Sequence, residues 1–335
     1  MQTNLSNSAT GEKFAFRDKL FELSRELGFE FAGIASAASS ESFAHFQRWI
    51  DDGCHAGMDY LAKNMEIRAE PRRLLPEAKS VLMLGVSFRT VLESAPELRQ
   101  LFFSSEEGSD CISVAAYACG IDYHLWIRQR LKKITEFHRQ TIPQGNCRGC
   151  VDTAPFFERQ YAQNAGLGTI GRNTMLIHPE WGSHFFLAAF LTTEELPASK
   201  PLEFHPCVDC QRCQKACPNG ALSEPFRLDA RKCVNYWTIE HKGPFSGSSF
   251  GCDLCQNACP WNREKIEAGC LPREVLAERN KEILKKTPVG RRHEAGGMRR
   301  EEEKMKRNVM TDTIPSSLMP PASSLMPPAF FRESK

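Results

Sequence analysis

The sequence predicts a domain that mixes α-helices with buried β-strands, followed by a short cysteine-rich module. Between residues 14 and 195, amphipathic helical segments alternate with apolar runs, which is typical of α/β and α+β domains. Between residues 207 and 259, eight cysteines gather in one stretch. The chain has 335 residues, enough for about two domains of ordinary size.

The first predicted element is a helix over residues 14–27, and Gly28 is placed to end it. Its apolar stripe consists of Phe16, Leu20, Leu23 and Leu27. The segment 29–35 predicts a strand. A second helix is expected within 42–53, ending at Gly53.

Two apolar runs, 81–88 and 183–192, predict strands that are covered on both faces. Residues 123–138 predict a helix between them. The apolar face of this helix is expected to hold Leu125, Leu131, Ile134 and Phe137. Residues 155–165 predict a further helix with Pro155 in its first turn. The fold class is therefore α+β or α/β-like for residues 14–199.

The cysteine spacing indicates two iron–sulfur clusters. One run of four cysteines has x2, x2, x3 spacing before Pro218; a lone cysteine follows, and a run of three ends before Pro260. In two-cluster bacterial ferredoxins the fourth cysteine of each run ligates the other cluster. The ligands assigned to one [4Fe–4S] cluster are Cys207, Cys210, Cys213 and Cys259. Those assigned to the second are Cys217, Cys233, Cys252 and Cys255. Residues 200–262 are thus expected to form a ferredoxin-like module that moves electrons singly.

Other uses of these cysteines fit less well. Disulfides require an oxidising compartment, and the N-terminal sequence lacks a basic stretch followed by an apolar one, as an export signal has. We therefore expect a cytoplasmic protein. Zinc suits a C-x2-C pair, but two runs that each close with Cys-Pro are an unusual zinc pattern. The scattered cysteines, interpreted as small buried hydrophobes, are Cys54, Cys111, Cys119 and Cys270. Cys147 and Cys150 are interpreted as a loop, with a redox or metal role as the lesser alternative.

Composition sets further bounds. The net charge is only +2, so a nucleic-acid partner would need a local basic patch. No apolar run is long enough to cross a bilayer, and no membrane partner is expected. Residues 1–13 are expected to be disordered, 263–309 to form a basic helical segment, and 310–335, where SSLMPPA occurs twice, to be a disordered tail.

The chain resembles epoxyqueuosine reductases over roughly residues 15–262. The matching stretches are GMDYLAKNMEIRAEPRRLLPEAKSVLML, YACGIDYH, VDTAPFFERQYAQNAGLGTIGRN, the first cysteine run, RKCVNYWTIEHKG and FGCDLCQNACPWN. The resemblance implies that the chain reduces an epoxide on the modified wobble base of tRNA, giving queuosine. It also implies cobalamin bound in the domain 14–199, with the two clusters relaying electrons to it.

The resemblance implies that Asp152 of VDTAP is the general acid. Cleavage of a C–O bond leaves an oxygen that must be protonated, and a carboxyl group whose pKa is raised by burial can supply the proton. The competing interpretation is structural, because Asp152 precedes a predicted helix and Asp is a good N-cap.

The cobalamin contacts implied by the resemblance are Arg68, Tyr123, His124, Asp152, Leu176, Leu187, Asn235, Cys252 and Asp253. Four of them have a plainer alternative: Arg68 as a surface salt-bridge residue, the two leucines as ordinary core, and His124 as a structural histidine. No histidine ligand to cobalt is expected.

The tRNA contacts implied by the resemblance are Arg227, His241 and Lys242, since cationic side chains bind phosphates without reading sequence. We expect a monomer that receives electrons from an external one-electron donor such as a ferredoxin or flavodoxin. Two other functions remain open: a reductive dehalogenase-like enzyme that also combines cobalamin with two clusters, and a non-catalytic electron-transfer protein. An electron carrier would not need a domain of this size before its clusters.

Overall fold

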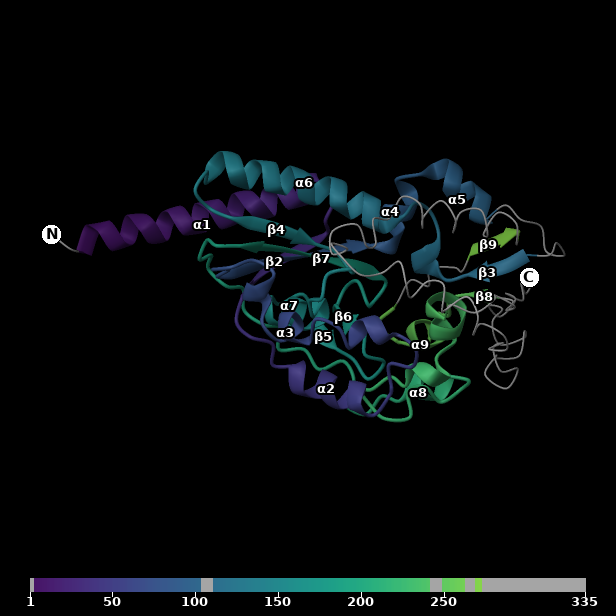
Figure 1. Cartoon of the computed structure of the whole chain (residues 1–335). Coiled ribbons are helices and arrows are strands. Elements are labelled where there is room, and N and C mark those ends of the chain that lie inside the picture. Colours follow the sequence, from purple (N-terminus) through teal and green to yellow (C-terminus); the bar gives the residue numbers. More distant parts are fainter. Residues whose placement is uncertain (1–2, 104–110, 242–248, 263–268, 273–335) are drawn as a thin grey trace, which may run out of the picture.

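The computed structural model describes residues 3–103, 111–241, 249–262 and 269–272, with side chains described from Gly11 onward. Helices cover both faces of a four-stranded sheet, and the cysteine-rich module lies to one side of it (Figure 1). No helix in this described part is long and apolar enough to span a lipid bilayer.

The main sheet has the strand order β1-β2-β7-β4, and every neighbouring pair is antiparallel. Its strands are β1 (Phe31–Ser36), β2 (Ser80–Ser87), β7 (Phe185–Thr192) and β4 (Cys147–Cys150). Every residue of β2 is buried, because helices lie on both faces of this central strand. Antiparallel pairing makes the domain α+β, one of the two classes that the sequence allowed.

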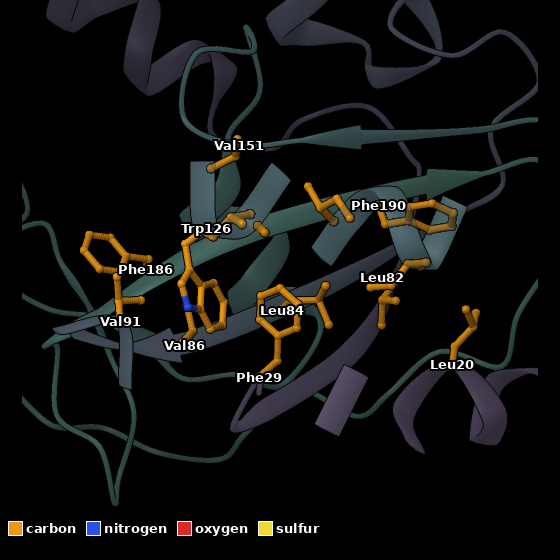
Figure 2. Packing of buried hydrophobic residues seen from close by; sticks show 14 of the residues in the cluster. Leu20, Phe29, Leu82, Leu84, Val86, Val91, Trp126, Val151, Phe186 and Phe190 are labelled. Atoms are coloured by element: carbon orange, nitrogen blue, oxygen red, sulfur yellow. The ribbon is translucent and has the colours of Figure 1, made fainter. Parts of the chain in front are cut away.

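The larger core lies between the sheet and the helices α1 (Thr3–Glu26) and α6 (Tyr123–Thr141). Figure 2 shows its packing, with Leu20 of α1 and Trp126 of α6 lying over Leu84 and Phe190 of the sheet. The side chains of β2 alternate between this core and the one on the other face, as the period of a strand requires. Leu125, expected on the buried face of α6, is instead 39% exposed.

Helix α1 begins at Thr3, so the expectation of disorder over 1–13 is wrong for residues 3–13. The helix ends where the sequence predicts. Gly28 has a φ of +91°, and the next backbone N–H, that of Phe29, donates to the carbonyl of Ser24. This left-handed glycine and its hydrogen bonds form the common C-terminal stop of a helix.

On the opposite face of the sheet, α7 (Glu158–Asn164) packs against β1, β2 and β7. The helix starts three residues after Pro155, so the prediction that Pro155 lies in its first turn is wrong, and this proline precedes the helix. Buried side chains of this second core include Met83, Tyr161, Ala189 and Leu191.

A second, three-stranded sheet joins distant parts of the chain. Its order is β8 (Ser249–Phe250), β3 (Cys111–Val114) and β9 (Gly269–Pro272), with β8 parallel and β9 antiparallel to β3. The prediction of a helical segment over 263–309 is therefore wrong at 269–272. The rest of that segment and the predicted tail 310–335 lie outside the described residues.

The remaining elements are short. Those of the N-terminal domain are α2 (Phe43–Asp51), η1 (Asp59–Leu61), α3 (Met65–Ala69), η2 (Pro71–Arg73), α4 (Phe88–Glu93), α5 (Pro96–Phe103), η3 (Ala116–Ala118), β5 (Thr169–Ile170) and β6 (Leu176–Ile177). Those of the cysteine-rich module are α8 (Arg212–Ala216), η4 (Ala230–Lys232), η5 (Tyr236–Glu240) and α9 (Leu254–Asn257).

The cysteines that were not assigned to a cluster lie on strands or in buried positions. Cys147 and Cys150 lie on strand β4 and not in a loop, and residues three apart on a strand point to opposite faces. Accordingly Cys147 packs against one core and Cys150 belongs to the other, so the pair does not form a chelating site. Cys54 and Cys119 are buried, as expected. Cys111 and Cys270, interpreted as buried hydrophobes, are instead only partly buried, and their side chains meet across β3 and β9 with Cα atoms 5.8 Å apart.

Candidate active site and metal centres

The four cysteines assigned to the first cluster line a common small cavity of about 10 Å³. The cavity walls consist of Cys207, Cys210, Cys213, Cys259, Asn173, Ile177, Pro206, Pro260 and Trp261. Cys213 is carried by α8 and Cys259 follows α9, and these two helices pack against each other. Within the described residues no three His, Cys, Asp or Glu side chains are arranged to hold a single metal ion; the four thiols are spread around the walls.

The thiols of this group influence one another electrostatically. Burial raises the pKa of Cys213, and the neighbouring Cys207, Cys259 and Cys210 raise it further. The second group behaves in the same way. Burial raises the pKa of Cys255 well above its ordinary value, with added contributions from Cys252, Cys233 and Cys217. The structure thus brings together the same two sets of four that the spacing predicted.

These surroundings fit iron–sulfur clusters. Burial raises the pKa of Cys252 to about 12, so the protein alone favours neutral thiols in the second group. Metal ligation requires thiolates, and the positive charge of iron compensates for the cost of burying them. Cysteine is also the usual ligand set of [4Fe–4S] clusters.

Asp152 forms a chain of hydrogen bonds with the start of α6. Its Oδ2 lies 3.1 Å from Nε2 of His124, and Nδ1 of that imidazole lies 2.8 Å from Oδ1 of Asp122. Asp122 is the N-cap of α6 and accepts from the backbone N–H of His124 at 2.9 Å. The imidazole is therefore held between two carboxylates and oriented by the helix that carries it.

The pKa values of this pair oppose the expectation of a protonated Asp152. Desolvation raises the pKa of Asp152, but the hydrogen bond and charge of His124 outweigh it, and the net pKa lies below the ordinary value. Desolvation lowers the pKa of His124, yet its two carboxylate partners raise the net pKa to about 9. At neutral pH the proton therefore resides on His124, and the side chain of Asp152, 58% exposed, is a carboxylate.

Asp152 does not cap a helix, so the structural alternative fails. Phe157 occupies the N-cap position of α7, and Asp152 has a φ of +47°, a left-handed conformation that is uncommon for a residue other than glycine. Its backbone N–H donates to Oε1 of Glu158 at 2.9 Å. Desolvation raises the pKa of Glu158 to about 8, and the charge of Asp152 contributes. Glu158 lies within the stretch VDTAPFFERQYAQN, but no role was predicted for it from sequence.

The second cysteine group adjoins this pair. Oδ2 of Asp253, next to Cys252, accepts from the backbone N–H of Ala116 at 2.7 Å. Burial raises the pKa of the neighbouring Tyr117, and the charges of Asp253, Glu240, Asp152 and Cys233 raise it further, in that order. Tyr117 therefore lies within electrostatic reach of both the aspartate and the second cysteine group.

Arg68 lies half-buried on α3, with its guanidinium over the ring of Phe46 at 5.5 Å. Its Nε is buried and has no hydrogen-bond partner, and no ion pair of Arg68 is found among the described residues. Burial lowers its pKa. A buried cationic donor without a protein acceptor suits a ligand with a polar rim, such as the amide-bearing edge of a corrin, better than the surface salt bridge that was the alternative.

The other residues proposed to contact cobalamin differ in their burial and in their contacts with the protein. The ring of Tyr123 stacks on Phe186 with centroids 4.2 Å apart. Asn235 accepts from the backbone N–H of Cys252 at 2.6 Å, and so it supports the turn that carries this cysteine. Leu176 is buried and Leu187 partly buried in the core on the α7 face of the sheet, which agrees with their alternative role as ordinary core.

Of the predicted tRNA contacts, two can be placed. Arg227 is ion-paired with Asp52 and Glu224 at 2.5 and 3.4 Å, so its charge is already partly balanced. The ring of His241 lies against Trp237, with centroids 4.8 Å apart. Lys242 lies outside the described residues.

A basic groove, which no sequence motif indicated, runs beside the loop that holds Asp152. It lies between α6, β4 and η2, and its cationic side chains are Arg73, Arg128, Lys132 and Arg148. Among its described lining residues none is acidic, and they include Val151, Thr153, Ala154 and Pro155 on either side of Asp152. Three separate segments contribute these charges, so no single stretch of sequence revealed the groove.

Two family models match the chain. One, described as Epoxyqueuosine reductase QueG, DUF1730, matches residues 68–153. The other, described as 4Fe-4S double cluster binding domain, matches residues 206–262. Together they cover the segments that hold Asp152 and all eight clustered cysteines.

Curated relatives and solved structures agree. The chain is 38% identical over 247 residues to the epoxyqueuosine reductase of Pseudomonas aeruginosa; the match covers 71% of this chain and 66% of that protein, just under two thirds of its length. It is 35% identical over 289 residues to the epoxyqueuosine reductase of Synechococcus sp., covering 79% of this chain and 84% of the relative.

Among solved structures, an epoxyqueuosine reductase crystallised with an epoxyqueuosine-modified tRNA-Tyr stem loop superposes with a TM-score of 0.67 and 26% identity, over 81% of this chain and 75% of that one. The Bacillus subtilis enzyme, crystallised with a catalytic aspartate loop swung out of its active site, gives the same TM-score, identity and coverage. From the Asp152 segment, the paired cysteine groups and these matches, the chain belongs to the epoxyqueuosine reductase family.

Proposed function

We propose that this chain reduces epoxyqueuosine to queuosine at the wobble position of tRNA, using cobalamin and electrons relayed by two [4Fe–4S] clusters. The reaction removes the epoxide oxygen: two C–O bonds break and a C=C bond forms. Two electrons and two protons are consumed, and the oxygen leaves as water. The electrons come from an external one-electron donor such as a ferredoxin or flavodoxin.

One observation carries this proposal: the hydrogen bond from the backbone N–H of Ala116 to Asp253, the residue next to Cys252. It ties the turn of the second cysteine group to the segment that leads into α6, where Asp122 and His124 hold Asp152. A plain electron carrier would have no use for a carboxylate–imidazole pair beside its cluster.

The chain's own residues would bind the cofactor and deliver the proton. Arg68, Tyr123 and Asp253 are the side chains that would contact cobalamin, which when bound supplies a strongly reducing and nucleophilic metal centre. The imidazolium of His124 would give its proton to Asp152, and Asp152 would pass a proton to the departing oxygen. In this relay the proton is stored on the imidazole, so the pKa of Asp152 itself can be low.

The basic groove supports tRNA as the partner. Arg73 and Lys132 form only exposed pairs, with Glu66 and Glu136 at 2.7 and 3.9 Å, and such pairs contribute little and exchange readily for phosphate. Arg148 is fixed by donation to the carbonyl of Leu74 at 2.8 Å. We propose that the RNA backbone lies in this groove, so that the modified base reaches Asp152; Lys242, His241 and Arg227 remain proposed contacts.

Electrons would enter beside the first cysteine group. Arg212 and Lys215 line shallow depressions next to Cys210 and Cys259, and the side chain of Val208 is exposed there. Asp209 is the acidic residue of the same surface. Cationic side chains around an apolar residue favour an acidic one-electron carrier protein.

The decisive experiment is an anaerobic assay. The protein is loaded with iron, sulfide and cobalamin, supplied with a reductant and tRNA bearing epoxyqueuosine, and the nucleosides are analysed by mass. Loss of one oxygen atom from the modified nucleoside supports the proposal. An unchanged nucleoside mass with fully loaded protein and tRNA bound would overturn it.

A further inference from the structure

We infer that the side-chain amide of Asn173 donates a hydrogen bond to the cluster held by Cys207, Cys210, Cys213 and Cys259 and thereby raises its reduction potential. The inference rests on the proposed cluster assignment. It gives a role to the stretch AGLGTIGRN, to which the proposed reaction assigns none.

The first observation is an unpartnered donor. Asn173 is 4% exposed, and its Nδ2 is buried without a hydrogen-bond partner. Its Oδ1 accepts from the backbone N–H of Met175 at 3.2 Å, which identifies the oxygen end of the amide and leaves both N–H groups unused. Buried donors are nearly always paired, and leaving one unpaired is costly.

The second observation is the cavity. Asn173 is one of its lining residues, together with the four cysteines. The ring nitrogen of Trp261, another lining residue, already donates to the carbonyl of Pro206 at 3.2 Å. Sulfur is the acceptor that the cysteine side chains of this cavity provide, so the free amide of Asn173 has cluster or cysteine sulfur as its partner.

The position of Asn173 is fixed by its surroundings. It lies in the turn between β5 and β6, and the adjacent Arg172 donates to the carbonyls of Cys207 and Val208, each at 3.1 Å. The turn is thus tied to the loop that carries the first cysteine. A role as a turn residue alone explains the contact of Oδ1 with Met175 but leaves the buried NH₂ group without a function.

The expected consequence concerns the potential. Reduction adds negative charge to the cluster, and a donor aimed at its sulfur stabilises the reduced form more than the oxidised form. The amide therefore makes the first cluster easier for an external donor to reduce than the same site would be without Asn173.

The test compares reduction potentials in the loaded protein. Asn173→Leu keeps the approximate shape and removes the donor. In a redox titration followed by electron paramagnetic resonance, the reduction potential of one cluster should become more negative by ~59 mV, which is a tenfold change in the one-electron equilibrium constant. The reduction potential of the other cluster should not change. The matched control is Gln211→Leu, which removes an exposed amide beside Cys210 but outside the cavity and should leave both potentials unchanged.

Unchanged potentials in Asn173→Leu, or equal shifts of both clusters, would overturn the inference. A second measurement needs no variant: wild-type protein labelled with ¹⁵N at asparagine side-chain amides should show ¹⁵N coupling in the pulsed resonance of one reduced cluster. If this ¹⁵N coupling is absent from protein with full iron content, only the role of Asn173 is overturned. If wild-type protein holds no cluster iron after loading, the cluster assignment is overturned as well.

Discussion

His124 and Asp152 form a hydrogen-bonded pair, with Nε2 3.1 Å from Oδ2, in which the imidazole and not the carboxyl holds the proton at neutral pH. His124 is oriented by local sequence, because its second carboxylate partner is Asp122, the N-cap of the same helix. In the proposed reaction, the imidazolium would supply the proton that Asp152 passes to the departing oxygen.

Asp152→Ala should reduce turnover by roughly 10²–10⁴-fold, the range for loss of a general acid. Iron content, cobalamin binding and tRNA affinity should remain, because Asp152 ligates no iron in this assignment. Single-turnover rates and the absorption spectra of the loaded variant check this. Turnover near the wild-type rate would remove Asp152 from the reaction.

The pH profile should report His124. Its pKa is raised to about 9, so the stored proton is present below this pH and lost above it, and the rate should fall as pH rises through about 9. In His124→Gln the largest influence that lowers the pKa of Asp152 disappears, while desolvation and the smaller lowering effects of Tyr123 and Arg159 remain. The reacting proton must then be held by Asp152 itself, and the fall should move to lower pH. His45→Gln, an exposed histidine on α2, is the control. A profile identical in wild type and His124→Gln would contradict the relay.

The basic groove predicts how the affinity for tRNA depends on salt concentration. Arg128→Gln with Lys132→Gln should weaken binding of the tRNA anticodon stem loop and lower the slope of log affinity against log salt by about 0.7–0.9 for each phosphate that is no longer neutralised. Lys19→Gln on α1, also exposed but away from the groove, should change neither quantity. Fluorescence anisotropy at several salt concentrations measures both, and an unchanged slope in the double variant would place the RNA elsewhere.

The surface over the first cysteine group predicts a charge effect on electron delivery. Lys215→Glu should raise the KM for an acidic carrier such as flavodoxin, most strongly at low ionic strength, because surface charges mainly steer encounter. Reduction by a small uncharged reductant should be unaffected and serves as the internal control. Equal rates with the carrier at all salt concentrations would exclude this docking face.

The burial of two phenylalanines predicts a difference in the free energy of unfolding between their alanine variants. Phe190 on β7 is fully buried, whereas Phe14 on α1 is 41% exposed. Phe190→Ala should lower the free energy of unfolding by about 3–5 kcal/mol through reduced apolar burial and a residual cavity, and Phe14→Ala by much less. Denaturant unfolding of the cluster-loaded protein measures the difference; similar decreases in both variants would show that the core is not where the fold gains its stability.

Much of the fold and of the metal centres could be predicted from the sequence. Helix periodicity located α1 and α6, and continuous apolar runs located β2 and β7, because these elements bury a regular face. Cysteine spacing located the iron–sulfur module, which a family model also matches over residues 206–262, since metal ligation ties chemistry to local sequence intervals; the assignment of each cysteine to a cluster stays a prediction.

Other features depended on contacts between distant segments. The prediction of a loop at strand β4 is wrong because its sequence CRGC has few apolar residues, and only pairing with β7 makes it a strand. Strand β9 is set by pairing with β3, about 160 residues earlier in the chain. The pKa of Asp152 was predicted in the wrong direction because the prediction considered desolvation alone, whereas His124, the partner that lowers this pKa, lies 28 residues away in the sequence.

Strand β8 comes just before Cys252 and is hydrogen-bonded in parallel to β3, which belongs to the N-terminal domain. The boundary at residues 199–200 is therefore a division of the sequence but not of the folded protein. The two parts share a backbone ladder, which joins the segment leading to Cys252 to the domain that holds Asp152. The cysteine-rich module can move as an independent body only if these hydrogen bonds break.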